Sequence, residues 1–181
     1  MSTLASPDSG HLLLMIRDLF DNAALWWGLS ACGVAQLSKL VVELVVEGRW
    51  NPRVLLETGG MPSSHSALMT GTAAGLGWQL GFGDPLFALA AALCFVVLYD
   101  ASGVRRAAGL TAERVNGLVA DAGGLVAGHL PERPLKQNLG HTRLQVLVGA
   151  LIGPLVALPG LVLVGSPLHL AQVWGWIAPV A

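Results

Sequence analysis

Apolar residues along the chain gather into long runs that are separated by short polar connectors. The first run, over about 24–46, is long enough to cross a bilayer, which takes a helix of roughly 20 mostly apolar residues. Similar runs follow over about 65–82, 86–99 and 144–164, and the run over 86–99 is short for a full crossing. The pattern predicts an all-α fold, a polytopic membrane helical bundle of about four to five transmembrane helices.

Other segments fit this pattern less simply. The stretch over 112–130 carries two acids, an arginine and an asparagine, so it is too polar to cross, and we predict an interfacial or re-entrant helix there. The tail around Trp174 and Trp176 is expected to form a short fifth helix or to lie at the membrane interface. The chain, 1–181, is expected to be a single integral membrane domain with a polar N-terminal segment over 1–22.

The composition places the chain in a lipid bilayer. Hydrophobic residues make up 54% of it and charged residues 12%, whereas soluble domains carry about a quarter charged residues. The net charge of −1 supplies no field for nucleic acid, so no nucleic-acid partner is expected. Cys32 and Cys94 lie inside apolar runs and give neither a disulfide framework nor metal-ligand spacing, so no metal or cofactor is expected.

The basic residues predict an orientation in the membrane. If the N-terminus is outside and 112–130 does not cross, only Arg17 of the ten basic residues lies across the membrane from the others. Those others are Lys39, Arg49, Arg53, Arg105, Arg106, Arg114, Arg133, Lys136 and Arg143. The positive-inside rule then predicts an integral membrane protein whose motif-bearing face is cytoplasmic.

The first apolar run has a polar face in its second half. Gln36, Lys39 and Glu43 are spaced three and four apart, so they share one side of a helix. Because a polar group in lipid is costly, this side is expected to face protein or water. The alternative is that Lys39 and Glu43 merely pair with each other, or that Lys39 extends to the membrane interface.

A polar stretch, "TGGMPSSHSA", stands directly at the start of the second run. The first N–H groups of a helix are unpaired and point outward, which makes such a start an anion site. Ser63 or Ser64 would cap the helix or donate to an anion, and His65 adds a group that titrates near neutral pH. The alternative is an ordinary serine cap with a histidine that takes no part in chemistry.

Two more polar clusters are expected at the same membrane face. In "GVRRAAG", Arg105 and Arg106 are either topology determinants or the forked donors that phosphate prefers. In "LGHTRLQVLVGALIG", His141 opens a helix and Gln145 follows one turn later. Phosphoryl transfer needs fixed positive charge, a nucleophile and an acid, and the three clusters together supply these groups. The membrane setting favours a lipid phosphate as substrate.

The stretches "GGMPSSHSA", "YDASGVRRAAG" and "LGHTRLQVLVGALIG" resemble the divergent branch of the type-2 phosphatidic acid phosphatase superfamily, which is related to acid phosphatases and vanadium-dependent haloperoxidases. The resemblance covers about 36–153. It implies that His65 is the general acid and that His141 is the nucleophile that becomes phosphorylated. The phosphate ligands that it implies are Lys39, Arg49 or Arg53, and Arg105 or Arg106, in addition to the two serines at the helix start.

Gln145 departs from the pattern of that superfamily, which has an acidic residue here to orient the nucleophile. A glutamine accepts a hydrogen bond from imidazole but does not stabilise the imidazolium charge. Loss of the acid in a comparable triad lowers the rate by orders of magnitude. Hydrolysis is therefore expected to be slow, unless another acid such as Asp100 or Asp121 serves instead.

Two functions stay open at this point. The first is an integral membrane phosphatase that hydrolyses a lipid phosphate or an isoprenoid (di)phosphate through a phosphohistidine intermediate. The second is a catalytically degenerate accessory or assembly factor of the same fold. Gly71, Gly75, Gly149 and Gly153 are spaced by four within their helices, which allows close helix contacts within the chain or in a homo-oligomer.

Overall fold

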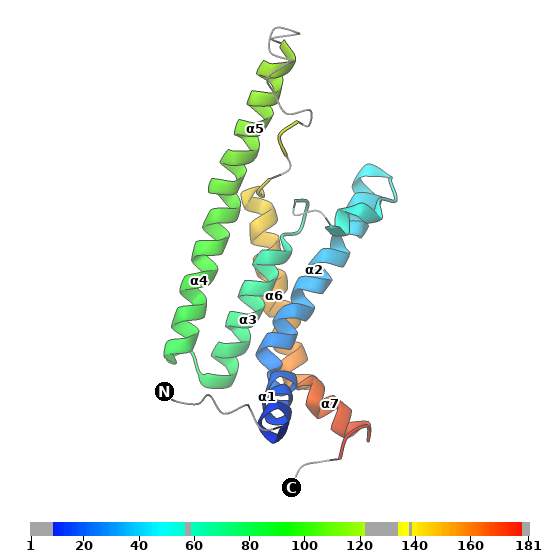
Figure 1. Ribbon diagram of the computed structural model, residues 1–181, viewed down its shortest axis with the longest axis vertical. Helices are drawn as coiled ribbons and strands as arrows, with labels where there is room; N and C mark the ends of the chain where they lie inside the picture. Colours follow the sequence, from blue (N-terminus) through cyan, green and yellow to red (C-terminus); the bar gives the residue numbers. More distant parts are fainter. Residues whose placement is uncertain (1–8, 57–58, 122–133, 138, 179–181) are drawn as a thin grey trace.

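The computed structural model describes residues 9–56, 59–121, 134–137 and 139–178, and every regular element among them is helical. The helices are α1 (Ser9–Asp21), α2 (Ala23–Glu47), η1 (Pro52–Leu56), α3 (Ser64–Leu80), α4 (Pro85–Ser102), α5 (Val104–Asp121), α6 (Arg143–Leu163) and α7 (Pro167–Val173) (Figure 1). The predicted all-α class is confirmed. The four apolar runs of the sequence correspond to α2, α3, α4 and α6.

α3 packs between its neighbours with small side chains. It runs along both α2 and α6, and α4 covers another of its sides (Figure 1). Ala67 is fully buried against Ala31 and Ala35 of α2. A Cβ on Gly153 of α6 would stand 2.6 Å from the Ala67 carbonyl oxygen, so the close approach of α3 and α6 requires glycine there. The predicted glycine stripe therefore serves contacts within the chain.

Three helical stretches of the described residues are long and apolar enough to cross a membrane: Ala23–Val46, Pro85–Asp121 and Arg143–Val173. α3, with 17 residues, is shorter and lies among them. Many large apolar side chains of these helices are exposed, as expected for surfaces that face lipid rather than water. The helices support the predicted membrane bundle.

α5 continues the line of α4 and projects beyond the ends of the other helices (Figure 1). Gly103 separates the two helices, and its N–H donates to the Tyr99 carbonyl at 2.8 Å. Polar side chains of α5, such as Glu113, are exposed. Residues 112–121 thus do not turn back into the bundle, so the re-entrant alternative is wrong for them, while 122–130 lie outside the described residues.

α1 and α7 pack together at the opposite end of the bundle (Figure 1). Ser166, the cap of α7, donates its hydroxyl to Asp21 at 2.7 Å, and the Trp27 indole donates to the Gly165 carbonyl at 2.8 Å. The segment over 1–22 was predicted to be polar. Its residues 9–21 instead form a helix with many exposed apolar side chains. The apolar surface of this helix comes from the unbroken run Leu12–Ile16, followed one turn later by Leu19 and Phe20.

Candidate active site

The polar motifs of the sequence meet at one end of the bundle. The last turns of α2, the first turn of α3, the junction of α4 with α5 and the first turn of α6 all lie at that end (Figure 1). α2 and α4 end at this face and α3 and α6 begin there, because α2 and α4 run toward it and α3 and α6 run away from it. The three motifs therefore share one face, and its cytoplasmic orientation stays a prediction from the positive-inside rule.

The polar face of α2 is covered by the connector that follows it. Gln36 donates its amide to the Leu55 carbonyl of η1, and Glu43 accepts from the Asn51 amide at 3.4 Å. Lys39 is only 2% exposed, and a Cβ on Gly60 would lie 3.7 Å from the Lys39 Cδ. The prediction that this face looks toward protein is confirmed, and it brings the Lys39 side chain beside the motif loop.

Ser63 starts α3 as its cap. Its hydroxyl oxygen accepts from the Ser66 backbone N–H at 3.4 Å and from the Ser66 hydroxyl at 2.9 Å. Its own N–H donates to the Gln145 carbonyl of α6 at 3.1 Å. Ser63 is therefore occupied as a structural cap, while the backbone N–H groups of Ser64 and His65 have no carbonyl partner one turn earlier in the helix. Ser64 is buried at this helix start.

His141 is fixed by close contacts of the segment that precedes α6. Gly140 has a φ of 77°, and an added Cβ would collide with the backbone of Arg105 and Arg106. The His141 N–H donates to the Ala101 carbonyl at the end of α4, at 2.9 Å. His141 is 4% exposed, and the Nε2 of its imidazole is buried with no hydrogen-bond partner among the described residues.

The two histidines line one small cavity of about 40 Å³ together with Asp100 and Arg105. Backbone and apolar side chains complete its wall, from Val97, Ala101, Leu139 and Gly140. His65 is exposed, whereas His141 is buried. We call this cavity the histidine cleft.

The environment of His141 keeps its imidazole neutral. Burial, and then the positive charges of Lys39, His65 and Arg105, lower the pKa of His141 from 6.5 to about 4. A neutral imidazole has a free lone pair on one nitrogen. The cleft therefore holds a buried imidazole that is neutral at neutral pH.

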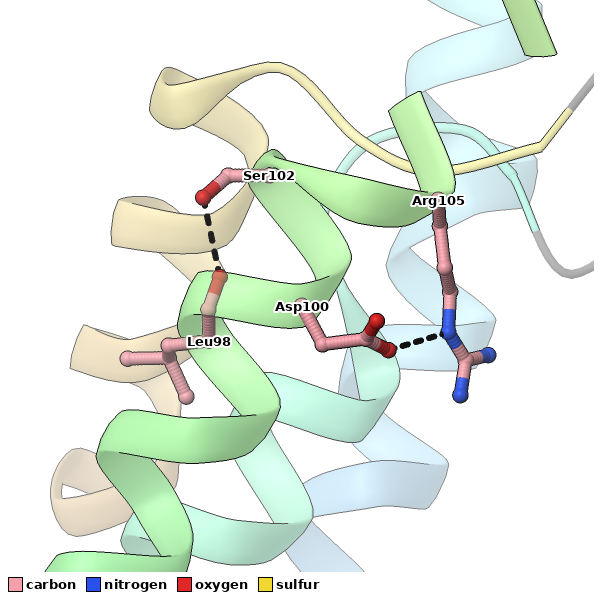
Figure 2. A network of polar contacts seen from close by, with 4 residues as sticks. All are labelled: Leu98, Asp100, Ser102 and Arg105. Carbon is pink, nitrogen blue, oxygen red and sulfur yellow. Dashed lines mark hydrogen bonds and ion pairs between the residues drawn. The ribbon is translucent and has the colours of Figure 1, made fainter. Parts of the chain in front are cut away.

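An ion pair forms one wall of the histidine cleft. Arg105 Nε donates to Asp100 Oδ2 at 2.6 Å (Figure 2). On α4, Ser102 donates its hydroxyl to the Leu98 carbonyl at 2.9 Å, away from the ion pair (Figure 2). The sequence offered Asp100 only as a substitute acid, because nothing in its spacing indicates that a carboxylate on α4 meets a histidine that precedes α6.

Gln145 does not occupy the place that the sequence predicted. Its side-chain oxygen accepts from the Thr142 backbone N–H at 2.8 Å, and the Thr142 hydroxyl accepts from the Gln145 N–H at 3.2 Å. This is a capping box, which satisfies two helix-terminal N–H groups at once. No hydrogen bond joins Gln145 to the His141 imidazole among the described residues. The Gln145 amide thus binds the helix start rather than the His141 imidazole.

The remaining predicted phosphate ligands lie apart from the histidine cleft. Arg106 lines a neighbouring polar cavity of about 460 Å³, along with Glu43, Glu113 and Gln145. Arg49 and Arg53 are exposed on the connector after α2. The structure therefore brings together Lys39, Arg105 and the two histidines, while the roles of Arg49, Arg53 and Arg106 stay predictions from the sequence. The described residues hold no group of three His, Cys, Asp or Glu side chains suited to a metal ion.

Comparison with known proteins places the chain in a family. The model of the "Divergent PAP2 family" matches residues 20–156. The chain belongs to the divergent PAP2 family. A relative in Bacillus subtilis (strain 168), "Uncharacterized membrane protein YuiD", is 35% identical over 150 residues, which cover 78% of this chain and 95% of the relative. No solved structure gives a significant match.

The matched region of this divergent PAP2 protein contains the whole histidine cleft, from His65 on α3 to His141 before α6. It ends inside α6, so α7 and most of α1 lie outside it. The family assignment therefore rests on the helices that build the cleft, and not on the two short helices that pack at the far end.

Proposed function

We propose that this protein is an integral membrane phosphatase that hydrolyses a lipid phosphate through a phosphohistidine intermediate, with the histidine cleft as its active site. The observation that carries the proposal is the His141 Nε2, which is buried and has no hydrogen-bond partner among the described residues. A buried polar atom is almost always satisfied. A phosphoryl group held in the cleft by the nearby positive charges would bring its electrophilic phosphorus against this free nitrogen.

The charges around the cleft support a phosphate monoester as ligand. Lys39 and Arg105 act electrostatically on the His141 imidazole, so a dianion placed beside it would be attracted by both. The first N–H groups of α3 add donors from the backbone. Arg105 is held by Asp100 at 2.6 Å, so a phosphate would compete with that carboxylate for the guanidinium.

The reaction assigns a separate task to each histidine. The lone pair of His141 Nε2 attacks phosphorus, a P–N bond forms, and the ester P–O bond breaks. Protonated His65 gives its proton to the departing lipid oxygen, which leaves as an alcohol. Neutral His65 then takes a proton from water, the hydroxide attacks phosphorus, the P–N bond breaks, and inorganic phosphate is released. The exposure of His65 suits a group that exchanges protons with solvent.

The second candidate is a catalytically degenerate accessory or assembly factor that binds a phosphorylated lipid without hydrolysis. The capping role of Gln145 favours it, because the residue expected to orient the nucleophile is engaged elsewhere. In this case the cleft would keep its affinity for anions and lose turnover.

Phosphate release by the purified protein separates the two candidates. A panel of phosphatidic acid, lysophosphatidic acid and isoprenoid mono- and diphosphates is presented in detergent micelles, with and without vanadate. The expected result is vanadate-sensitive release, abolished in His141→Ala and retained in His169→Ala, whose exposed histidine lies on α7 at the far end. Vanadate binding to an inert wild-type protein would instead support the accessory factor, and inertness with no anion binding would refute both.

A further inference from the structure

The histidine cleft has room for only a small part of a lipid. Its volume of about 40 Å³ compares with the roughly 300–1,000 Å³ of ordinary ligand pockets. If a lipid phosphate is the substrate, its hydrocarbon part must lie outside this cleft. The surface next to the cleft therefore decides which molecules bring a phosphate to it.

An apolar groove of about 810 Å³ lies directly beside the cleft, between α4 and α6. Asp100 lines both spaces, so the last turns of α4 are the wall between them. The groove is lined from α4 by Phe95, Val96, Leu98, Tyr99, Asp100 and Ser102, and from the α6 side by Arg143, Val146, Leu147 and Ala150.

The lining of the groove is almost entirely apolar. The hydroxyl of Ser102, a polar group on its wall, is already satisfied by the Leu98 carbonyl (Figure 2). Phe95, Val96 and Tyr99 are exposed along its α4 side. A flexible chain without polar atoms fits such a surface, whereas a polar headgroup would lose its hydrogen bonds with water there.

The mouth of the groove, in contrast, carries a positive charge from Arg143. Arg143 is the first residue of α6 and is exposed. A cation in the first turn of a helix faces the positive end of the helix dipole, which is unfavourable. An anion bound at this position would compensate for that repulsion. Arg143 thus stands where the apolar groove meets the end of the bundle that holds the histidine cleft.

We propose that the α4–α6 groove holds the hydrocarbon chain of an anionic lipid, and that Arg143 binds the phosphate headgroup at the mouth of the groove beside the histidine cleft. The inference rests on the proposed function for the identity of the headgroup. Arg143 lines the groove, Arg105 lines the cleft and Asp100 lines both, so a headgroup held by Arg143 stands next to the cleft. Arg143 is a specificity residue and not a catalytic one.

Photocrosslinking tests the groove without reference to turnover. The probes are a phosphatidic acid that carries a diazirine in the middle of one acyl chain, and the diacylglycerol with the same chain. The phosphatidic acid is expected to label peptides that contain 95–99 and 146–150, with a yield about tenfold above the diacylglycerol, as a headgroup contact of 1.4 kcal/mol gives. Equal labelling by the two probes, or labelling elsewhere, overturns the inference.

Substitutions then separate the groove from the reaction. Arg143→Gln is expected to raise KM for the micellar lipid about tenfold with kcat unchanged, and Arg143→Lys restores part of the effect. Lys136→Gln, which removes an exposed cation outside the groove, is the matched control. Ala150→Trp fills the groove and lowers groove labelling, whereas Leu151→Trp places the same bulk on an exposed neighbouring position of α6.

The two proposals fail in different ways. Hydrolysis of phosphatidic acid without headgroup-dependent labelling of the groove refutes the lipid subsite and leaves the phosphatase in place. Headgroup-dependent labelling of the groove that Arg143→Gln abolishes, in a protein that releases no phosphate, confirms the subsite and refutes the phosphatase. A KM that is the same in Arg143→Gln and Lys136→Gln refutes the role of Arg143.

Discussion

The backbone N–H of His141 donates to the carbonyl of Ala101 at 2.9 Å, which ties the segment before α6 to the last turn of α4. The neighbour of Ala101 in the chain is Asp100, whose carboxylate holds Arg105. This backbone hydrogen bond therefore places the buried His141 beside the Asp100–Arg105 ion pair, which lies about forty residues earlier in the sequence. The position of the imidazole depends on this contact and not on α6 alone.

The first prediction concerns pH. Unfolded His141 takes up its proton near pH 6.5 and folded His141 only near 4, so the unfolded state binds more protons between these values. The free energy of unfolding should fall as the pH drops from about 6.5 to about 4, by on the order of 2 kcal/mol or a few degrees in Tm. Thermal denaturation in detergent across this range measures the effect.

His141→Gln is the control for the pH prediction, because glutamine does not titrate. The part of the pH dependence that comes from His141 should vanish in this variant, and a profile identical to wild type would contradict the prediction. The same pKa predicts that any hydrolysis by wild type persists down to about pH 5, since His141 stays neutral there.

The spans could be predicted from the sequence because each depends on local pattern alone. A bilayer requires long apolar helices with internally satisfied backbones, so the runs that became α2 and α6 were evident. The polar face of α2 was also predictable, since Gln36, Lys39 and Glu43 repeat at helical spacing. The N-terminal helix was missed, because its leucines share a short segment with several polar residues.

The contacts within the site could not be predicted from the sequence, because most of them depend on how the helices pack. The sequence placed Gln145 one turn from His141, which suggested a hydrogen bond to the imidazole. It also contained Thr142 three residues earlier, the pattern of a capping box, and that local interaction is the one that formed. Asp100 could not be assigned to the cleft, because its proximity to His141 comes from the packing of α4 against the segment before α6.

The second prediction follows from this capping role. Glutamate fits the same box and is favoured by the helix dipole, so Gln145→Glu should leave Tm unchanged or raise it. Gln145→Ala should lower the free energy of unfolding by about 1 kcal/mol. Hydrolysis by Gln145→Glu should stay within about tenfold of wild type, because the carboxylate remains at the cap. A much larger gain in rate would mean that residue 145 turns to His141 after all.

The third prediction tests the close packing of α3 and α6. Gly153→Ala places a Cβ within 2.6 Å of backbone atoms of Ala67 and Gly71, and such overpacking costs about 1–3 kcal/mol. Gly33→Ala is the matched control, because nothing lies within 4 Å of its added Cβ. The free energy of unfolding of Gly33→Ala should rise by up to about 1 kcal/mol, because alanine has a higher helix propensity than glycine. Equal Tm values for the two variants would contradict the packing.

The fourth prediction concerns orientation. With Cys32 and Cys94 replaced, single cysteines at the exposed positions Trp50 and Lys136 should react with an impermeant maleimide only from the cytoplasm. A cysteine at Phe82, exposed in the connector after α3, should react only from the other side. Reaction of Trp50→Cys and Lys136→Cys from different sides would contradict the shared face.

The fifth prediction concerns the segment that leads to His141. Asn116 of α5 donates its amide to the Leu135 carbonyl and accepts the Leu135 N–H, both at 2.9 Å. Asn116→Leu removes both bonds, and the Leu135 amide should then exchange its hydrogen about tenfold faster, as the loss of roughly 1.4 kcal/mol of local stability gives. Hydrogen exchange read by mass spectrometry on peptides that cover 134–137 measures this.

Thr111→Ala is the control for the Asn116 substitution, because the Thr111 hydroxyl donates only within α5, to the Ala107 carbonyl. It should leave exchange at Leu135 unchanged. If the segment is what positions the imidazole, Asn116→Leu should also lower the rate of hydrolysis while the affinity for vanadate falls little, since the charges of Lys39 and Arg105 come from α2 and α5 themselves. Faster hydrogen exchange at Leu135 with an unchanged rate of hydrolysis would mean that the contact with Ala101 alone holds His141 in place.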